Sequence, residues 1–263
     1  MKDNGNNKKC EYILEAIGIK KHFGGVYALD NVDLRLKYNE IMGLVGDNGA
    51  GKSTLIKIIS GILPMDKGEI YIEGEKVNIK NPKDALNLGI ETVYQNLNLI
   101  DLQNVSFNIF LGREVNLRRP LGLLGFVNDR VMNIEAKKLI DSLDINLGNL
   151  TNPMINYSGG QRQAVAISKA IYWGRRIVIL DEPTAALGVK ESARALEFIK
   201  MLKEKSNLSI IIISHNMQHI FSVVDRVMVL RRGKLITVQN ISEVTATDIV
   251  KYITGSDKVF ERI

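Results

Sequence analysis

The chain of 263 residues is poor in cysteine, proline and tryptophan, with one, five and one of them respectively. The single cysteine, Cys10, cannot form an intrachain disulfide, which excludes a disulfide-stapled fold and favours a reducing compartment. No apolar run approaches the roughly 18 residues that cross a bilayer, and the first residues lack the apolar core of a signal peptide. We therefore expect a soluble chain that reaches a membrane only through a partner.

The composition is that of an ordinary globular protein, with 45% hydrophobic and 24% charged residues. The net charge of +6 permits contact with phosphates or an anionic membrane surface, but a solvated basic surface explains it as well. The same two interpretations apply to a group of arginines, Arg113, Arg118, Arg119 and Arg130. Residues 1–10 are polar and low in complexity, which predicts a flexible tail.

Three short runs, rich in β-branched residues, are apolar at consecutive positions: Ile41–Val45, Ile177–Leu180 and Ile210–Ile213. This pattern is typical of parallel strands buried on both faces. Helical periodicity separates or follows the runs, over Lys52–Ile59, Ile134–Leu143, Gln161–Tyr172 and Glu191–Lys203. The alternation predicts an open, mostly parallel α/β sheet with ligands at the carboxyl ends of its strands.

Two regions break this alternation. Residues 11–40 and 66–80 carry short β-rich segments with turns, which predict a small antiparallel sheet. Residues 97–172 are mostly helical and polar, with a Gly/Pro-rich interruption at Arg119–Gly125. They predict a helical subdomain inserted between the first two parallel strands named above.

A phosphate-binding loop follows the first of these strands and precedes the first helix. The eight residues fit G-x-x-x-x-G-K-[ST]: Gly46, Asp47, Asn48, Gly49, Ala50, Gly51, Lys52 and Ser53. Glycines let backbone N–H groups curl around phosphates, and the helix N-terminus adds a favourable dipole. The pattern predicts a nucleoside triphosphate, with Lys52 at the β- and γ-phosphates, Ser53 on Mg²⁺ and Thr54 at the α-phosphate.

Two acidic residues close the second strand. Asp181 and Glu182 follow Ile177–Leu180, and Pro183 then stops the strand. An acid placed beside a phosphate loop can hold Mg²⁺ through water, and a second acid can polarise the attacking water as a general base. We assign these roles to Asp181 and Glu182 in that order.

A pair of glycines opens the third predicted helix. Ser158, Gly159, Gly160 and Gln161 fit a capping box. The same groups make an anion site, because two glycines, a hydroxyl and a helix N-terminus favour a phosphate. The segment is therefore a well-capped helix start, a site for another ligand, or a contact for the γ-phosphate held by a second copy. Spacing leaves these alternatives open.

Taken together, four motifs resemble those of the ATP-binding cassette (ABC) ATPases: the phosphate loop, Tyr157–Gln161, Ile179–Pro183 and Ile211–His215. The resemblance implies a P-loop NTPase core over residues 11–255, a helical subdomain at 97–172 that carries the signature, and a tail at 256–263. It also implies a head-to-tail dimer that sandwiches two ATP molecules. Ser158, Gly159, Gly160 and Gln161 would then face the partner's ATP, although Tyr157 stands where the family usually has leucine.

The resemblance assigns roles to further residues. Gln95 matches the glutamine that reaches Mg²⁺ and the attacking water, and Phe23 matches the aromatic residue that stacks on adenine. His215 matches the switch histidine at the γ-phosphate. His22 and His219 match nothing, and we expect both at the surface.

One position departs from the common pattern, because Gly188 stands where the family usually has an aspartate that links the two nucleotide sites. Four strings, however, look like the simple-sugar importer branch, in which this glycine is a shared trait: Phe23–Leu29, Gly89–Gln95, Asn108–Glu114 and Ala185–Glu191. That branch implies a peripheral ATPase on the cytoplasmic face of the cell membrane.

The implied partners are transmembrane permease subunits docked on Asn96–Glu114, a second cassette, most simply a homodimer, and indirectly an external sugar-binding protein. No nucleic-acid partner is implied, because the chain lacks the coiled-coil insertion of a DNA-repair ATPase. A GTPase is disfavoured because no Asn-Lys-x-Asp sequence is present. An ABC ATPase for a different cargo, such as an amino acid or lipid, or one outside transport, remains the alternative.

Overall fold

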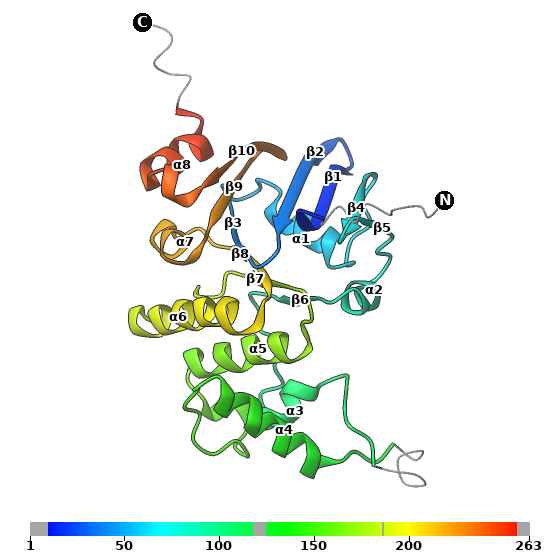
Figure 1. Ribbon diagram of the computed structural model, residues 1–263, viewed down its shortest axis with the longest axis vertical. Helices are drawn as coiled ribbons and strands as arrows, with labels where there is room; N and C mark the ends of the chain where they lie inside the picture. Colours follow the sequence, from blue (N-terminus) through cyan, green and yellow to red (C-terminus); the bar gives the residue numbers. More distant parts are fainter. Residues whose placement is uncertain (1–9, 118–124, 186, 257–263) are drawn as a thin grey trace, which may run out of the picture.

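A computed structural model describes residues 10–117, 125–185 and 187–256, without the side chain of Lys205. Most of the predicted N-terminal tail, most of the interruption at Arg119–Gly125 and most of the predicted C-terminal tail lie outside these ranges. The chain forms two sheets, and the helices α3 and α4 lie farther from them, beyond α5 (Figure 1). The predicted α/β class, with a mostly parallel sheet, an antiparallel sheet and inserted helices, is confirmed.

The larger sheet has six strands in the order β10-β9-β3-β8-β7-β6. Its strands are β3 (Ile41–Val45), β6 (Ile90–Val93), β7 (Ile177–Asp181), β8 (Ser209–Ile213), β9 (Arg226–Arg231) and β10 (Lys234–Asn240). All neighbours pair in parallel except β9 and β10. Every residue of β3 and of β8 is buried, which explains why these strands are apolar at consecutive positions and not at alternate ones.

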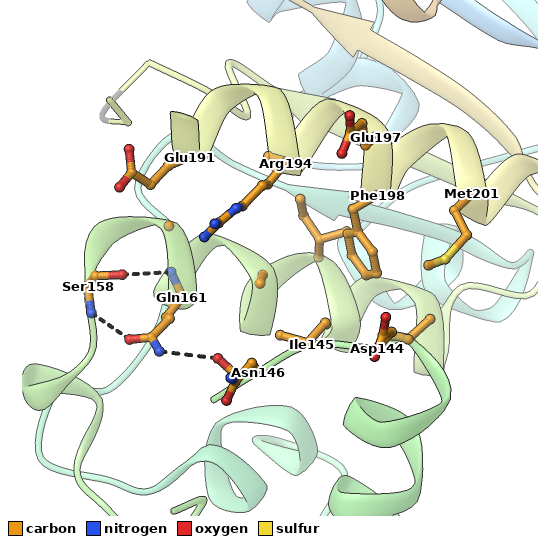
Figure 2. Close-up of a pocket in the computed structure, with 15 residues that line it drawn as sticks. Asp144, Ile145, Asn146, Ser158, Gln161, Glu191, Arg194, Glu197, Phe198 and Met201 are labelled. Carbon is orange, nitrogen blue, oxygen red and sulfur yellow. Dashed lines mark hydrogen bonds between the residues drawn. The ribbon is translucent and has the colours of Figure 1, made fainter. Parts of the chain in front are cut away.

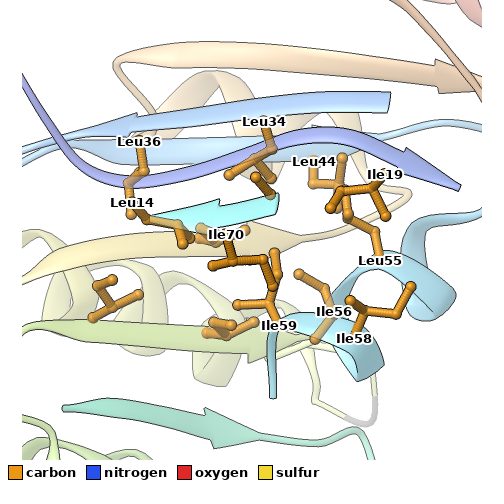
Figure 3. Close-up of a cluster of buried hydrophobic side chains, with 14 of the residues drawn as sticks. Leu14, Ile19, Leu34, Leu36, Leu44, Leu55, Ile56, Ile58, Ile59 and Ile70 are labelled. Carbon is orange, nitrogen blue, oxygen red and sulfur yellow. The ribbon is translucent and has the colours of Figure 1, made fainter. Parts of the chain in front are cut away.

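The smaller sheet is antiparallel, with the order β2-β1-β4-β5. It comprises β1 (Tyr12–Phe23), β2 (Val26–Lys37), β4 (Lys67–Ile72) and β5 (Glu75–Val77). Together with α1 (Lys52–Ile59) it covers one face of the parallel sheet. Figure 3 shows this core, in which Leu14 of β1, Ile56 and Ile59 of α1 and Leu44 of β3 belong to one buried cluster.

A second cluster covers the opposite face of the parallel sheet. Ile41 and Val45 of β3 belong to it, whereas Met42 and Leu44 belong to the first cluster, as the period of two in a strand requires. The helices on this face are α5 (Gly159–Trp173), α6 (Val189–Ser206), α7 (Met217–Val223) and α8 (Ala246–Thr254). Among the described residues, no helix is long and apolar enough to cross a membrane.

The segment between β6 and β7 is helical, as expected. It contains α3 (Val105–Phe110), α4 (Asp129–Ser142), the short 3-10 helix Met154–Asn156 and α5. A third buried cluster holds them together, and Tyr157 belongs to it. The Tyr157 hydroxyl donates a hydrogen bond to the carbonyl of Asn149. The tyrosine therefore fills the subdomain core with its ring and finds a partner for its polar tip, which makes it an acceptable substitute for an aliphatic residue.

One arginine of the basic group joins the helical segment to the parallel sheet. The Arg113 guanidinium lies 2.9 Å from a Glu91 oxygen on β6 and 4.7 Å from the ring centroid of Trp173 at the end of α5. The Trp173 indole in turn donates to the carbonyl of Ile109, at 2.8 Å. Arg113 is therefore an internal contact and not part of an anion-binding surface, whereas Arg130 is exposed. Arg118 and Arg119 lie outside the described residues.

Replacing Arg113 tests this joint. Burial raises the pKa of Glu91 and Arg113 opposes the rise, so Arg113→Gln leaves a mostly buried carboxyl without its partner. We expect the free energy of unfolding to fall by about 1–3 kcal/mol, measured by urea denaturation. Arg130→Gln, which removes an exposed charge from the same region, is the control and changes stability by less than about 0.5 kcal/mol. Equal losses in both variants would contradict the assignment.

Candidate functional site

The site lies where three adjacent parallel strands end. β8 pairs with both β3 and β7, so the carboxyl ends of the three strands meet at one edge of the sheet. Gly46 directly follows β3, Asp181 is the last residue of β7, and His215 comes two residues after β8. Sequence positions far apart are thus brought together by strand order alone, at the edge where α/β sheets bind ligands.

The phosphate loop is closed around its own lysine. The Lys52 ammonium donates to the carbonyls of Gly46, at 2.6 Å, and Asp47, at 3.0 Å. Burial lowers the pKa of Lys52, while the negative charges of Glu182, Asp47 and Asp181 oppose the change. Lys52 therefore remains a charged group next to the acidic strand end, in a loop that opens directly into α1.

Two loop glycines are required by close backbone contacts. A Cβ on Gly46 would lie 2.2 Å from the carbonyl oxygen of Leu230, and one on Gly51 would lie 2.6 Å from that of Ala28. Gly51 also has φ of +104°, a left-handed conformation that glycine adopts without strain. The loop is thus packed against β9 and the start of β2, and has little freedom to collapse.

The two acidic residues, Asp181 and Glu182, stand at the end of β7 and in the turn after it. Burial raises the pKa of Asp181, the neighbouring Glu182 raises it further, and Lys52 counteracts both. Glu182 has φ of +52°, and its backbone N–H donates to the carbonyl of Ile213 at 2.9 Å. This holds the turn after β7 against the end of β8.

Glu182 and His215 are in direct contact. The Glu182 Oε1 lies 2.9 Å from Nδ1 of His215. The carboxylate is 15% exposed and the imidazole 73% exposed. A half-buried carboxylate held by an outward-facing histidine is suited to polarising a water molecule at the rim of the sheet.

A cleft of about 760 Å³ lies between Glu182 and the helical segment. Its lining includes Gln95 just after β6, Glu182, and Gly159 at the start of α5. Gln163 also lines it; this side chain is buried, and among the described residues its Nε2 has no hydrogen-bond partner. Our sequence interpretation missed Gln163, because a glutamine in the second turn of a helix has no distinguishing pattern.

The predicted capping box is present at the start of α5. Ser158 Oγ accepts from the Gln161 N–H at 3.3 Å, and Gln161 Oε1 accepts from the Ser158 N–H at 3.0 Å (Figure 2). Gln161 Nε2 donates to the carbonyl of Asn146. The N–H groups of Gly159 and Gly160 belong to the first turn, which has no acceptor within the helix. They are the donors left for an anion.

The side chain of Glu191 links this segment to the turn before α6. A Cβ on Gly160 would lie 2.9 Å from Cγ of Glu191, and one on Gly188 would lie 2.5 Å from Oε2 of Glu191. Glu191 therefore occupies the space beside both glycines, in a second cleft of about 720 Å³ between α5 and α6 (Figure 2). A side chain at position 188 would meet only the far end of this flexible carboxylate, which can shift, so the contact does not by itself require glycine.

The predicted adenine-stacking residue is exposed. Phe23 is 51% exposed at the end of β1 and pairs with Val26 across the hairpin. The strand that leaves this hairpin carries Ala28, whose carbonyl packs against Gly51. The ring therefore belongs to a hairpin that adjoins the phosphate loop.

The two remaining histidines differ from each other. His22 is exposed, with Nδ1 2.6 Å from Asp66, as expected for a surface residue. The expectation holds only in part for His219, which is partly exposed and lies 2.9 Å from the Thr184 hydroxyl. A histidine in the first turn of a short helix gave no signal of burial in the sequence.

Fold and site together define a P-loop ATPase whose inserted helical segment carries a capped helix start with two glycines. Residues 29–185 match the ABC transporter family. The chain belongs to this family, and is accordingly an ATP-binding subunit that hydrolyses ATP for transport.

Known relatives and solved structures similar to this chain are also ATP-binding proteins of import systems or ABC transporters. The xylose/arabinose import ATP-binding protein XylG of Sulfolobus acidocaldarius is 45% identical, covering 92% of this chain and 94% of that protein. The fructose import ATP-binding protein FrcA of Rhizobium meliloti is 43% identical, covering 94% and 95%. The ADP conformation of MJ1267, an ATP-binding cassette of an ABC transporter, has a TM-score of 0.77 at 25% identity, covering 93% and 99%.

A glycine substitution tests the loop geometry. Gly51→Ala places a Cβ against the Ala28 carbonyl and must displace the loop, whereas a Cβ on Gly49, with φ of +78°, meets no atom within 4 Å. We expect Gly49→Ala to add only about 1–2 kcal/mol of backbone strain. Gly51→Ala should lose more stability than this and weaken ATP binding more than tenfold, measured by thermal unfolding and calorimetric titration. Similar values for both variants would show that the Ala28 contact does not matter.

Proposed function

We propose that this chain powers the import of a simple sugar, as a peripheral subunit on the cytoplasmic face of the cell membrane. The support comes from relatives at 43–45% identity whose names specify xylose/arabinose, fructose and ribose import. Because these identities are nearly equal, they favour the simple-sugar class without favouring one sugar. Identifying the permease subunit that co-purifies with this chain, and the sugar bound by its external binding protein, tests the cargo.

The observation that carries the mechanism is the contact of Glu182 with His215 next to the phosphate loop. We propose that ATP binds with adenine on Phe23 and its phosphates in the loop formed by residues 46–54. Lys52 would then exchange its loop carbonyls for the β- and γ-phosphates. The loop N–H groups and the N-terminus of α1 supply the remaining positive potential.

The oxygen donors at this edge fit Mg²⁺. Among the described residues there is no group of three or more His, Cys, Asp or Glu side chains for a metal. Mg²⁺, however, is typically held by one or two protein oxygens together with substrate phosphates and water. Ser53, Asp181 and Gln95 would hold it. Burial and Glu182 raise the pKa of Asp181, and a bound Mg²⁺ would lower that pKa again because it favours the charged carboxylate. The ion would neutralise charge that develops on the phosphates.

Glu182 is the proposed general base. Its carboxylate would accept a proton from the attacking water, while Gln95 orients that water and His215 contacts the γ-phosphate. The cleft that joins Gln95, Glu182 and Gly159 is consistent with this division of roles. Gln95 comes two residues after β6 and precedes the helical segment, so its position depends on how that segment sits.

We propose that two cassettes assemble head to tail, with Ser158, Gly159, Gly160 and Gln161 facing the partner's ATP. The free N–H groups of Gly159 and Gly160 support this, and the similar MJ0796 cassette is described as dimeric with ADP and Pi bound. Residues 11–255 would act as one ATPase domain. Permease subunits would dock on Asn96–Glu114 and connect it to the external sugar-binding protein.

Glu182→Gln tests the base. The amide keeps the shape of the side chain but cannot accept the proton, so turnover should fall at least 100-fold while ATP affinity changes little. Steady-state phosphate release and calorimetric titration measure the two quantities. Normal hydrolysis by Glu182→Gln would exclude Glu182 as the base.

Ser158→Arg tests the shared site. A bulky side chain at this helix start should block the neighbouring subunit's ATP and leave the phosphate loop of its own chain intact. In a head-to-tail dimer of one Ser158→Arg subunit and one Glu182→Gln subunit, both changes fall in the same composite site. The other site is unchanged and should stay active. Hydrolysis that is unaffected in Ser158→Arg homodimers would exclude the head-to-tail arrangement.

A further inference from the structure

His219 has an enclosed set of hydrogen bonds that the proposed chemistry does not use. It lies in the first turn of α7, four residues after His215. Its Nδ1 is 2.9 Å from Oγ1 of Thr184, and its Nε2 is 3.3 Å from Nδ2 of Asn216. Thr184 is only 6% exposed and lies two residues after Glu182.

The partners of the ring determine its tautomer. Asn216 caps α7, and its Oδ1 accepts from the backbone N–H of His219. Its amide nitrogen therefore faces the ring, and because an amide nitrogen only donates, Nε2 of His219 must accept. The ring proton is then on Nδ1, which donates to the Thr184 hydroxyl. Both ring nitrogens are satisfied only in this neutral form.

The charges around the ring are compatible with a neutral form. Burial lowers the pKa of His219, the nearby His215 lowers it further, and Glu182 opposes both effects. A protonated ring would present a second donor to the Asn216 amide and lose that hydrogen bond.

The turn after β7 and the segment after β8 are thus joined at two points. Glu182 contacts His215 at one point, and Thr184 contacts His219 at the other. The second contact is more buried, because His215 is exposed whereas Thr184 is enclosed. It also connects to the end of β8, since Ser214 Oγ accepts from the Asn216 N–H at 3.1 Å.

We propose that His219 is a positioning residue for hydrolysis: its neutral imidazole ties Thr184 to the start of α7 and so holds Glu182 against His215. This inference rests on the proposed role of Glu182. The side chain does not touch the reacting atoms. It acts by fixing the turn between Glu182 and Thr184, in which Glu182 adopts a positive φ of 52° that its surroundings must maintain.

Steady-state ATPase kinetics on purified dimers test the contact between His219 and Thr184. His219→Ala and Thr184→Val each remove one partner, and we expect each to lower kcat about tenfold with little change in the KM for ATP. The double variant should be no slower than either single variant, because both remove the same contact. His219→Gln can donate and accept at similar positions and should retain more than half of the activity. His22→Ala, at the exposed histidine, is the control and should be unchanged.

Nitrogen-15 NMR of the imidazoles provides a readout that loss of packing alone would not produce. The chain has only three histidines, so the His219 signals are assigned by their loss in His219→Gln. At neutral pH they should report a proton fixed on Nδ1, and Thr184→Val should shift the Nδ1 signal.

Three results would overturn the inference: a proton on Nε2, full activity of His219→Ala, or losses that multiply in the double variant. These measurements are distinguishable from failure of the proposed base. If Glu182→Gln hydrolyses ATP but His219 and Thr184 remain coupled, the tie exists and the role of Glu182 is wrong.

Discussion

The pairing of β8 between β3 and β7 is the constraint on which the site depends. It places a phosphate loop, an acidic strand end and a histidine at one sheet edge, although they come from residues 46–53, 181–182 and 215. The pairing is possible because all three strands are apolar on both faces and can be covered by α1 and the small sheet on one side and by helices on the other. Lys52 and Asp181 at this edge are partly buried, so their charges are less screened by water than charges at an exposed surface.

Burial also explains why Lys52 and Asp181 have pKa values shifted in the directions that favour their neutral forms. The charge of Asp181 partly reverses the shift in the pKa of Lys52, and the charge of Lys52 partly reverses that of Asp181. In the proposed complex, a polyphosphate would add negative charge beside Lys52, and a divalent cation would add positive charge beside Asp181. The proposed metal–nucleotide complex would therefore complement this edge better than a nucleotide or cation alone.

Much of this could be predicted from the sequence, because the informative patterns are local. The α1 boundaries Lys52–Ile59 and the strand Ile41–Val45 match the structure, since a glycine-rich loop marks where one ends and the other begins. Contacts between distant segments left no comparable pattern. The Arg113–Glu91 pair joins residues 22 apart and depends on the ring of Trp173, and Thr184 meets a histidine 35 residues later. Single-sequence patterns report periodicity and motifs, whereas such contacts depend on how finished elements pack.

The two ends of α5 make different contacts. At its start, the capping box uses the side chains of Ser158 and Gln161 within the chain, leaving the Gly159 and Gly160 N–H groups. At its end, Trp173 is held through Arg113 to β6, the strand that leads to Gln95. The helix has 15 residues and is about 22 Å long, so the Arg113 contact and the glycine pair lie at its opposite ends. The strand that leads to Gln95 and the helix that begins with the glycine pair are therefore in contact through Glu91, Arg113 and Trp173.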